Sequence, residues 1–266
     1  MTIIRQPSVA GLFYPADPGA LARDVHHYLD AAETPRRAPE LQPPKALIAP
    51  HAGYIYSGPV AGSAYAQITA LAGRIERVVL LGPAHRMALR GLAYSRADVF
   101  RTPLGSVAVD RRALEGLADL PQVREQDAPF EGEHCLEVQL PFLQLTLGTF
   151  ALVPLLVGDA DGAEVAEVLA RLWGGDETLI VISSDLSHYL GYAQARVIDA
   201  RTSQAIAELR PEAIGYEQAC GRIPIAGLLL EARRRGLTAE VLDLRNSGDT
   251  AGPRDRVVGY GAYVLH

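Results

Sequence analysis

Three short apolar segments constrain the fold of this chain most strongly. They cover residues 46–49, 78–81 and 178–182, and none of them alternates apolar with polar residues. An uninterrupted apolar run of this length is typical of a strand that is covered on both faces, as in a parallel sheet with flanking helices. We therefore predict an α/β fold: a single three-layer domain over residues 1–266 with a mainly parallel or mixed central sheet.

Helix signals lie between these segments. Asp17 and Pro18 suit the start of a helix, and apolar residues follow them at four-residue spacing. A second helix is predicted to begin near Pro224 and to end at the basic run 233–235, before a glycine. The proline-rich stretch 34–44 is expected to connect the first helix to the first core strand.

Histidine or aspartate follows each of the three apolar segments. His51 and His85 follow the first two, and Asp185 and His188 follow the third. Because ligands bind beyond the carboxyl ends of strands in open α/β sheets, we expect the three histidines to share a pocket. If the chain turns helical after residue 182, Asp185 and His188 share one face of that helix. The alternative is structural, since such residues also cap helices or make local hydrogen bonds.

A further polar cluster lies in residues 131–142, which look like the first turns of a helix. Glu133 and His134 are adjacent there, and a carboxylate beside an imidazole can form a proton-transfer pair. The helix dipole alone would also favour Glu133 at this position. Since adjacent helical residues point in different directions, we expect only one of the two to face the pocket.

The chain has two cysteines, which are too few for a disulfide scaffold in a protein of this size. Cys220 precedes a predicted helix and lies near Arg222, an arrangement that favours the thiolate as a nucleophile or a soft metal ligand. The alternative is a small buried cysteine that packs like alanine. We interpret Cys135 as a packing residue.

Composition argues against several classes of partner. The net charge is −6, and the only basic run lies at a predicted helix end, so we expect no nucleic-acid partner. No apolar run approaches the roughly 20 residues that span a bilayer, and no signal-peptide stretch begins the chain, so we expect a soluble, cytoplasmic protein and no membrane partner. Phosphate-loop and dinucleotide-binding glycine motifs are missing, which predicts no nucleotide cofactor.

Segments along nearly the whole chain resemble the Memo family, also called AmmeMemoRadiSam system protein B. The histidine motif at residues 50–58 and the aspartate-histidine motif at 183–188 are the most specific of them. Weaker matches lie at residues 11–15, 81–85, 133–142 and 220–224. The resemblance implies a fold similar to the catalytic subunit of class III extradiol dioxygenases, which are non-haem iron enzymes.

The resemblance also implies a mononuclear metal site formed by His51, His85 and Cys220, with iron or copper as the metal. Extradiol enzymes use two histidines and a carboxylate, so a thiolate in the third position moves the preference toward softer metals. The implied function is redox or dioxygenase-like chemistry on a small molecule. Whether the chain is an enzyme at all does not follow from these residues.

In the same pocket, the resemblance places Asp185 and His188. We expect His188 to act as general acid and base, with Asp185 orienting it or a metal ligand. Glu133 or His134 would complete the proton path. Tyr54 and Ser57, which follow the first histidine, are candidates for binding the substrate, although Tyr54 could simply pack and Ser57 could stabilise a turn.

Two functions of other classes remain open. The first is a non-catalytic binding or adaptor protein that uses the same pocket for a peptide or a small ligand. The family has been described as recognising phosphotyrosine-bearing receptor tails, which the acidic charge of this chain does not favour. The second is metal-free hydrolysis by a Cys220 thiolate beside a histidine base. The family name also implies an association with a radical-enzyme partner.

Overall fold

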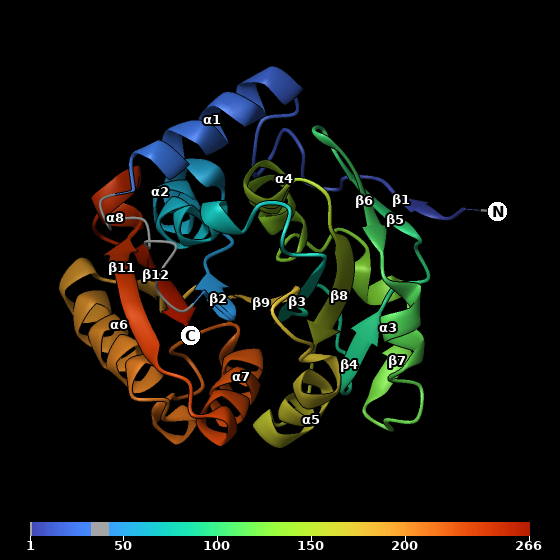
Figure 1. Ribbon diagram of the computed structural model, residues 1–266. Coiled ribbons are helices and arrows are strands. Elements are labelled where there is room, and N and C mark those ends of the chain that lie inside the picture. Colours follow the sequence, from blue (N-terminus) through green and yellow to red (C-terminus); the bar gives the residue numbers. More distant parts are fainter. Residues whose placement is uncertain (1, 33–42) are drawn as a thin grey trace.

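The three apolar segments form neighbouring strands at the centre of one sheet (Figure 1). The computed structural model describes residues 2–32 and 43–266, and in it these strands are β2 (Ala46–Ala49), β3 (Arg77–Pro83) and β9 (Thr178–Ser183). β9 lies between β2 and β3 and pairs in parallel with both. Every residue of β2 and β9 is buried, which confirms strands that are covered on both faces.

Antiparallel strands extend this parallel centre and make the sheet mixed. β8 (Ala151–Val157) pairs in parallel with β3, whereas β12 (Val257–Leu265) pairs antiparallel with β2. The strand order is β1-β5-β6-β8-β3-β9-β2-β12-β10, with β11 beside β12 and with β4 beside β7 and β8. The remaining strands are β1 (Ile4–Arg5), β4 (Leu92–Tyr94), β5 (Val99–Thr102), β6 (Gly105–Val109), β7 (Val123–Glu125), β10 (His188–Leu190) and β11 (Ala239–Asn246).

Helices cover both faces of the sheet, which confirms the predicted α/β class. In Figure 1, α1 (Pro18–Asp30), α2 (Tyr54–Tyr65) and α4 (Leu140–Leu147) form one layer. The opposite layer contains α5 (Gly162–Leu172), α6 (Tyr192–Ala207) and α7 (Arg222–Arg235), of which α5 and α7 pack closely together. Two short helices, α3 (Arg111–Glu115) and α8 (Ser247–Thr250), and the 3-10 helices η1 (Ala66–Leu71), η2 (Ala128–Phe130), η3 (Glu137–Gln139) and η4 (Pro211–Ala213) complete the described secondary structure.

The helix signals read from the sequence act as predicted in α1 and α7. The Asp17 carboxylate accepts a hydrogen bond from the backbone N–H of Ala20 at 2.8 Å, and the apolar residues at four-residue spacing are buried. α7 ends at Gly236, whose φ of 71° suits a glycine that ends a helix. Residues 34–42 of the proline-rich stretch lie outside the described residues.

Two local predictions are wrong. The helix expected to begin around Glu133 begins only at Leu140, so Glu133 and His134 lie in the loop before it. The Glu133 carboxylate accepts hydrogen bonds from backbone N–H groups of its own loop, which stabilises a non-helical turn. The chain also does not turn helical after β9, because His188 begins β10 and pairs with Val258 of β12.

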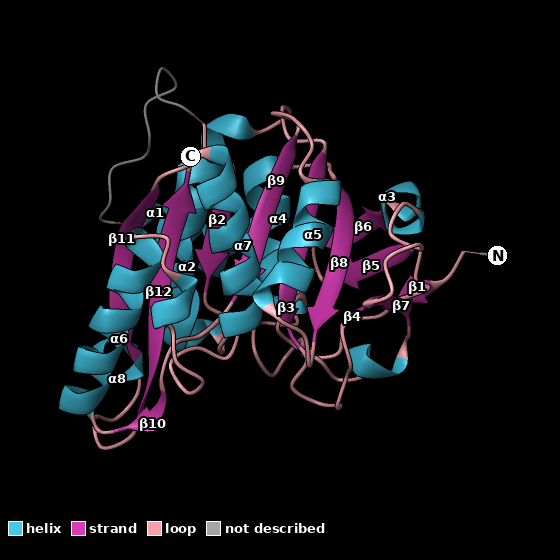
Figure 2. Ribbon diagram, turned by 90° about the horizontal axis from the view of Figure 1, so that it is seen from below, coloured by secondary structure: helices cyan, strands magenta, loops and turns pink. Residues whose placement is uncertain are grey.

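Parallel pairing determines where the polar residues gather. Figure 2 shows the arrowheads of β2 and β8 at the same edge of the sheet, where long loops lie. The register pairs Ala49 with Ser183 and Leu81 with Ile182, so the segments after β2, β3 and β9 leave the sheet side by side.

In the described part of the chain, no helix combines the length and apolar character needed to cross a bilayer.

Candidate metal site at the carboxyl edge of the sheet

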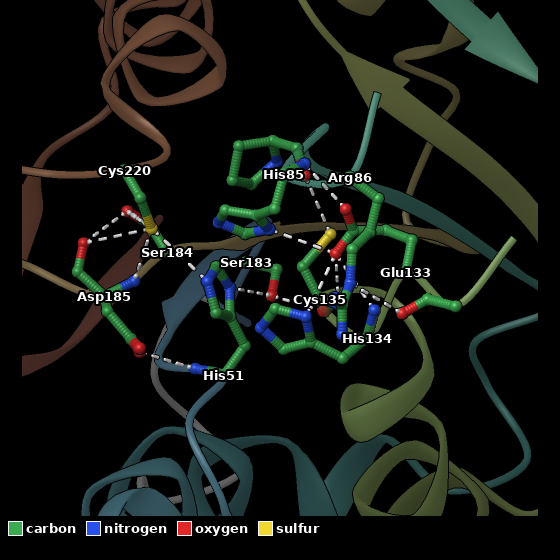
Figure 3. Close-up of polar contacts among 12 residues, drawn as sticks. His51, His85, Arg86, Glu133, His134, Cys135, Ser183, Ser184, Asp185 and Cys220 are labelled. Carbon is green, nitrogen blue, oxygen red and sulfur yellow. Dashed lines mark hydrogen bonds and ion pairs between the residues drawn. The ribbon is translucent and has the colours of Figure 1, made fainter. Parts of the chain in front are cut away.

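Three imidazole rings converge beyond the carboxyl ends of β2 and β3 (Figure 3). The ring centroids of His51 and His85 are 5.1 Å apart, and His134 lies 5.3 Å from His51 and 4.9 Å from His85. One ring nitrogen from each histidine lies within 4.8 Å of the other two. The structure therefore brings the predicted pair together and adds His134, which we had expected only in a proton path.

His51 is the most deeply buried of the three, with 1% of its surface exposed. Burial and the neighbouring rings of His85 and His134 hold the pKa of His51 well below its ordinary value, so the ring is neutral at pH 7. A neutral imidazole keeps a lone pair, which is the form that binds metal ions.

Cys220 lies on the other side of His51. Its Sγ is 3.3 Å from His51 Nε2 and accepts a hydrogen bond from the backbone N–H of Asp185 at 3.3 Å. The prediction of a favoured thiolate is wrong, because burial and the Asp185 carboxylate raise the pKa of Cys220 to about 12. Arg222 does not offset this effect, since its guanidinium stacks over the exposed ring of Tyr216 at 4.6 Å.

Glu133 holds His85 in place. Its carboxylate accepts hydrogen bonds from the backbone N–H of His85 at 2.6 Å and from His85 Nδ1 at 3.0 Å. Burial alone would raise the pKa of Glu133, but the imidazoles of His134 and His85 hold it well below its ordinary value. Because an ionised carboxylate can only accept, Nδ1 of His85 carries the hydrogen, and in the neutral ring the lone pair therefore lies on Nε2.

His134 touches the same carboxylate less directly. Its Nδ1 lies 3.2 Å from Glu133 Oε1 but without hydrogen-bond geometry, and its ring packs against Phe13 with centroids 4.5 Å apart. A second group of potential ligand atoms combines His85, Glu133 and Cys135. The Cys135 thiol is buried and donates to the backbone carbonyl of Pro83 at 3.2 Å, a packed position of the kind predicted for it.

Asp185 and His188 reach the site in different ways. Asp185 Oδ1 accepts a hydrogen bond from the backbone N–H of His51 at 2.7 Å, and burial raises the pKa of this carboxyl group. Asp185 thus positions the backbone of His51. His188 lines a cavity of about 530 Å³ together with Cys220, so its imidazole borders the space next to the thiol.

A second cavity of about 410 Å³ also borders Cys220 and extends along Met87 and Ile223. Tyr216, Ala219 and Cys220 line both cavities and lie between them.

The two residues predicted to bind substrate, Tyr54 and Ser57, are buried. The Tyr54 hydroxyl donates to the carbonyl of Val138 at 2.7 Å, and the Ser57 hydroxyl donates to that of Ala52 at 2.8 Å. Both hydroxyls are occupied by the main chain.

Comparison with known proteins assigns the chain to a family. A model for Memo-like proteins matches residues 5–264. The chain belongs to the Memo family. It is 35% identical to a MEMO1 family protein of Methanosarcina barkeri, with 98% of this chain and 100% of the relative covered. A MEMO1 family protein of Aeropyrum pernix is 38% identical, with 97% of this chain and 98% of the relative covered.

A solved structure shares the fold. An uncharacterized protein from Escherichia coli K12 superimposes with a TM-score of 0.50 over 81% of this Memo-family chain and 98% of its own length. Its sequence identity is 14%, so the likeness concerns the fold alone. The match to the family model confirms the Memo resemblance that the motifs predicted. The strand order confirms the predicted mixed sheet of an α/β fold.

Proposed function

We propose that this chain holds one metal ion through the imidazoles of His51 and His85, with the Cys220 sulfur as the third donor, and performs redox chemistry on a small organic molecule. The observation that carries the proposal is the convergence of ring nitrogens from His51, His85 and His134 within 4.8 Å of one another, with the Cys220 sulfur 3.3 Å from His51 Nε2. Of these histidines only His51 is fully buried, and a few convergent polar side chains beside a cavity are typical of a binding site.

Two of the proposed donors lie at a distance that suits binding to one metal ion. His51 Nε2 and Cys220 Sγ are 3.3 Å apart, and two donors bound at about 2.0 Å and 2.3 Å to one ion lie about 3.5 Å from each other. His85 is held with its Nε2 lone pair free. His134 offers a further imidazole on the side opposite Cys220, as Figure 3 shows.

Imidazole and sulfur donors together favour copper and are also compatible with iron. The bound metal would supply a Lewis acid and a site for electron exchange. The Cys220 thiol would lose its proton on binding the metal, because the thiolate is the ligand form. Asp185 would hold the His51 backbone in position throughout.

Substrate would bind in the cavity of about 530 Å³ between His188 and Cys220. His188 would serve there as general acid and base, since its imidazole borders that space and imidazole is the side chain most often used for proton transfer. Glu133, whose pKa is strongly lowered, is suited to hold His85 and not to transfer protons itself. His134 is the better candidate for the proton path on that side.

Metal content of protein purified without oxygen and without an affinity tag tests the proposal. We expect about one iron or copper per chain, and His51→Ala and His85→Ala should each lose it because they remove a ligand. His26→Ala on the exposed surface of α1 is the matched control and should keep the metal. Absence of metal from the unmodified protein, even after anaerobic reconstitution, would overturn the proposal.

A binding or adaptor role is the second candidate, and exposed apolar side chains favour it. Met87, Tyr189 and Tyr216 are 49%, 64% and 79% exposed, and each lies within four residues of His85, His188 or Cys220. Met87 and Tyr216 line the cavities beside Cys220, and exposed apolar side chains there are typical of a surface that receives a peptide or an organic ligand. The association with a radical-enzyme partner stays a prediction from the family resemblance.

A further inference from the structure

We propose that a buried hydrogen-bond chain through Tyr65, Gln139 and Ser183 positions His51 with its hydrogen on Nδ1, so that Nε2 presents a lone pair toward Cys220. The inference rests on the proposed function only in making that lone pair a metal donor. The position of the hydrogen itself is a property of the metal-free protein. Two backbone carbonyl groups, which can only accept hydrogen bonds, set the direction of this chain.

The first carbonyl sets the orientation of the Gln139 amide. Pro50 O lies 2.9 Å from Gln139 Nε2, so the atom that faces it must be the NH₂ group. The amide oxygen then points away and accepts the Tyr65 hydroxyl hydrogen at 2.8 Å. With this orientation, the NH₂ group also donates to Ser183 Oγ at 2.7 Å.

The second carbonyl sets the direction of the Ser183 hydroxyl. Cys135 O lies 2.6 Å from Ser183 Oγ and must receive the single hydroxyl hydrogen. One lone pair of Ser183 accepts from Gln139. The contact that remains is His51 Nδ1 at 2.8 Å, and because Ser183 has no second hydrogen to give, Nδ1 must be the donor.

Because the whole chain of hydrogen bonds is buried, the His51 ring has no alternative arrangement. Tyr65, Gln139 and Ser183 are 0% exposed and His51 is 1% exposed, so solvent offers no alternative partner. The backbone N–H of His51 is held separately by Asp185 at 2.7 Å. Both the orientation of the ring and its tautomer are therefore determined by neighbours that do not touch the cavities.

Removal of the serine hydroxyl predicts a specific change. In Ser183→Ala, Nδ1 loses its acceptor, whereas an Nε2 hydrogen could be donated to Cys220 Sγ 3.3 Å away. The ring should then move its hydrogen to Nε2, which removes the lone pair from the metal side. Metal affinity should fall by about 10- to 100-fold, the range expected for loss of a partner that orients a ligand.

The test is nitrogen NMR of metal-free protein labelled with ¹⁵N-histidine at neutral pH, because a ring nitrogen that bears hydrogen resonates far from one that does not. We expect the hydrogen of His51 on Nδ1 in the unmodified protein and on Nε2 in Ser183→Ala. Ser63→Ala is the matched control, since Ser63 is also buried but donates to Asp243 at 2.8 Å in another part of the chain. This control should retain the Nδ1 hydrogen and the metal affinity.

A hydrogen on Nε2 in the unmodified protein would overturn the inference, and this measurement does not depend on whether any variant folds. An unchanged tautomer in folded Ser183→Ala would overturn it as well. If the unmodified protein shows the Nδ1 hydrogen but binds neither iron nor copper, the proposed metal function fails while the positioning of His51 stands. The two proposals thus have separate outcomes.

Discussion

His51 and His85 occupy equivalent places after neighbouring strands, but different partners hold them. The Nδ1 of His51 contacts the neutral hydroxyl of Ser183, whereas the Nδ1 of His85 contacts the ionised carboxylate of Glu133. His51 is 1% exposed, while the His85 side chain is 28% exposed. Burial of the His51 ring penalises charge, so a neutral hydrogen-bond chain suits it, whereas the more exposed His85 ring is held by a buried carboxylate whose charge several N–H donors compensate. In both rings Nδ1 contacts the partner from the protein, so two kinds of interaction serve the same purpose.

Loss of the charged partner should have the largest effect on stability. Glu133→Gln should lower the free energy of unfolding by about 3 kcal/mol, because the carboxylate is buried and its charge is compensated by several N–H donors. Ser183→Ala should lower it by about 0.5–1.5 kcal/mol, the usual range for a neutral hydrogen bond. Urea unfolding of both variants measures the difference, and equal losses would remove the distinction between the two histidines.

The same pair of variants should respond differently to pH. The pKa of Glu133 is lowered in the folded protein, so the carboxylate contributes stability above its ordinary pKa of about 4.3 and loses that contribution as the pH falls further. The stability gap between the unmodified protein and Glu133→Gln should therefore shrink as the pH falls below about 4. The gap for Ser183→Ala should stay nearly constant there. Urea unfolding at several pH values would show whether the first gap shrinks, and a constant first gap would contradict an ionised Glu133.

Direct coordination by the Cys220 sulfur predicts the smallest of the expected effects. Cys220 contacts His51, so Cys220→Ser should weaken copper binding by about tenfold and iron binding by less, because a hydroxyl is a harder and poorer ligand for copper. Competition titration with each metal measures both affinities. Cys135→Ala is the control, and its copper-to-iron ratio should match that of the unmodified protein. An equal loss of both metals in Cys220→Ser would argue against direct coordination by sulfur.

The sequence was sufficient for the central strands, for α1 and α7, and for the family. Apolar runs and helix caps are local signals, so the positions of His51 and His85 after their strands could be predicted from a few neighbouring residues. Family motifs then brought in Cys220, which lies 169 residues from His51 in the chain and 3.3 Å from it in space. No local spacing could have placed that sulfur.

The tertiary structure alone decided how the site residues are held. Glu133 lies in a loop and not in the predicted helix, because N–H groups of His85 and of its own loop donate to its carboxylate. His134, the next residue, therefore lies beside the ring of His85. Burial and the Asp185 carboxylate raise the pKa of the Cys220 thiol, although the thiol precedes a helix. Arg222 does not lower this pKa, because its guanidinium lies over the ring of Tyr216. Ser183 and Gln139 lie within the family motifs at residues 183–188 and 133–142, but no local pattern indicated a role for either side chain. Hydrogen-bond direction and pKa depend on which distant groups are buried together, and only the folded chain brings those groups into contact.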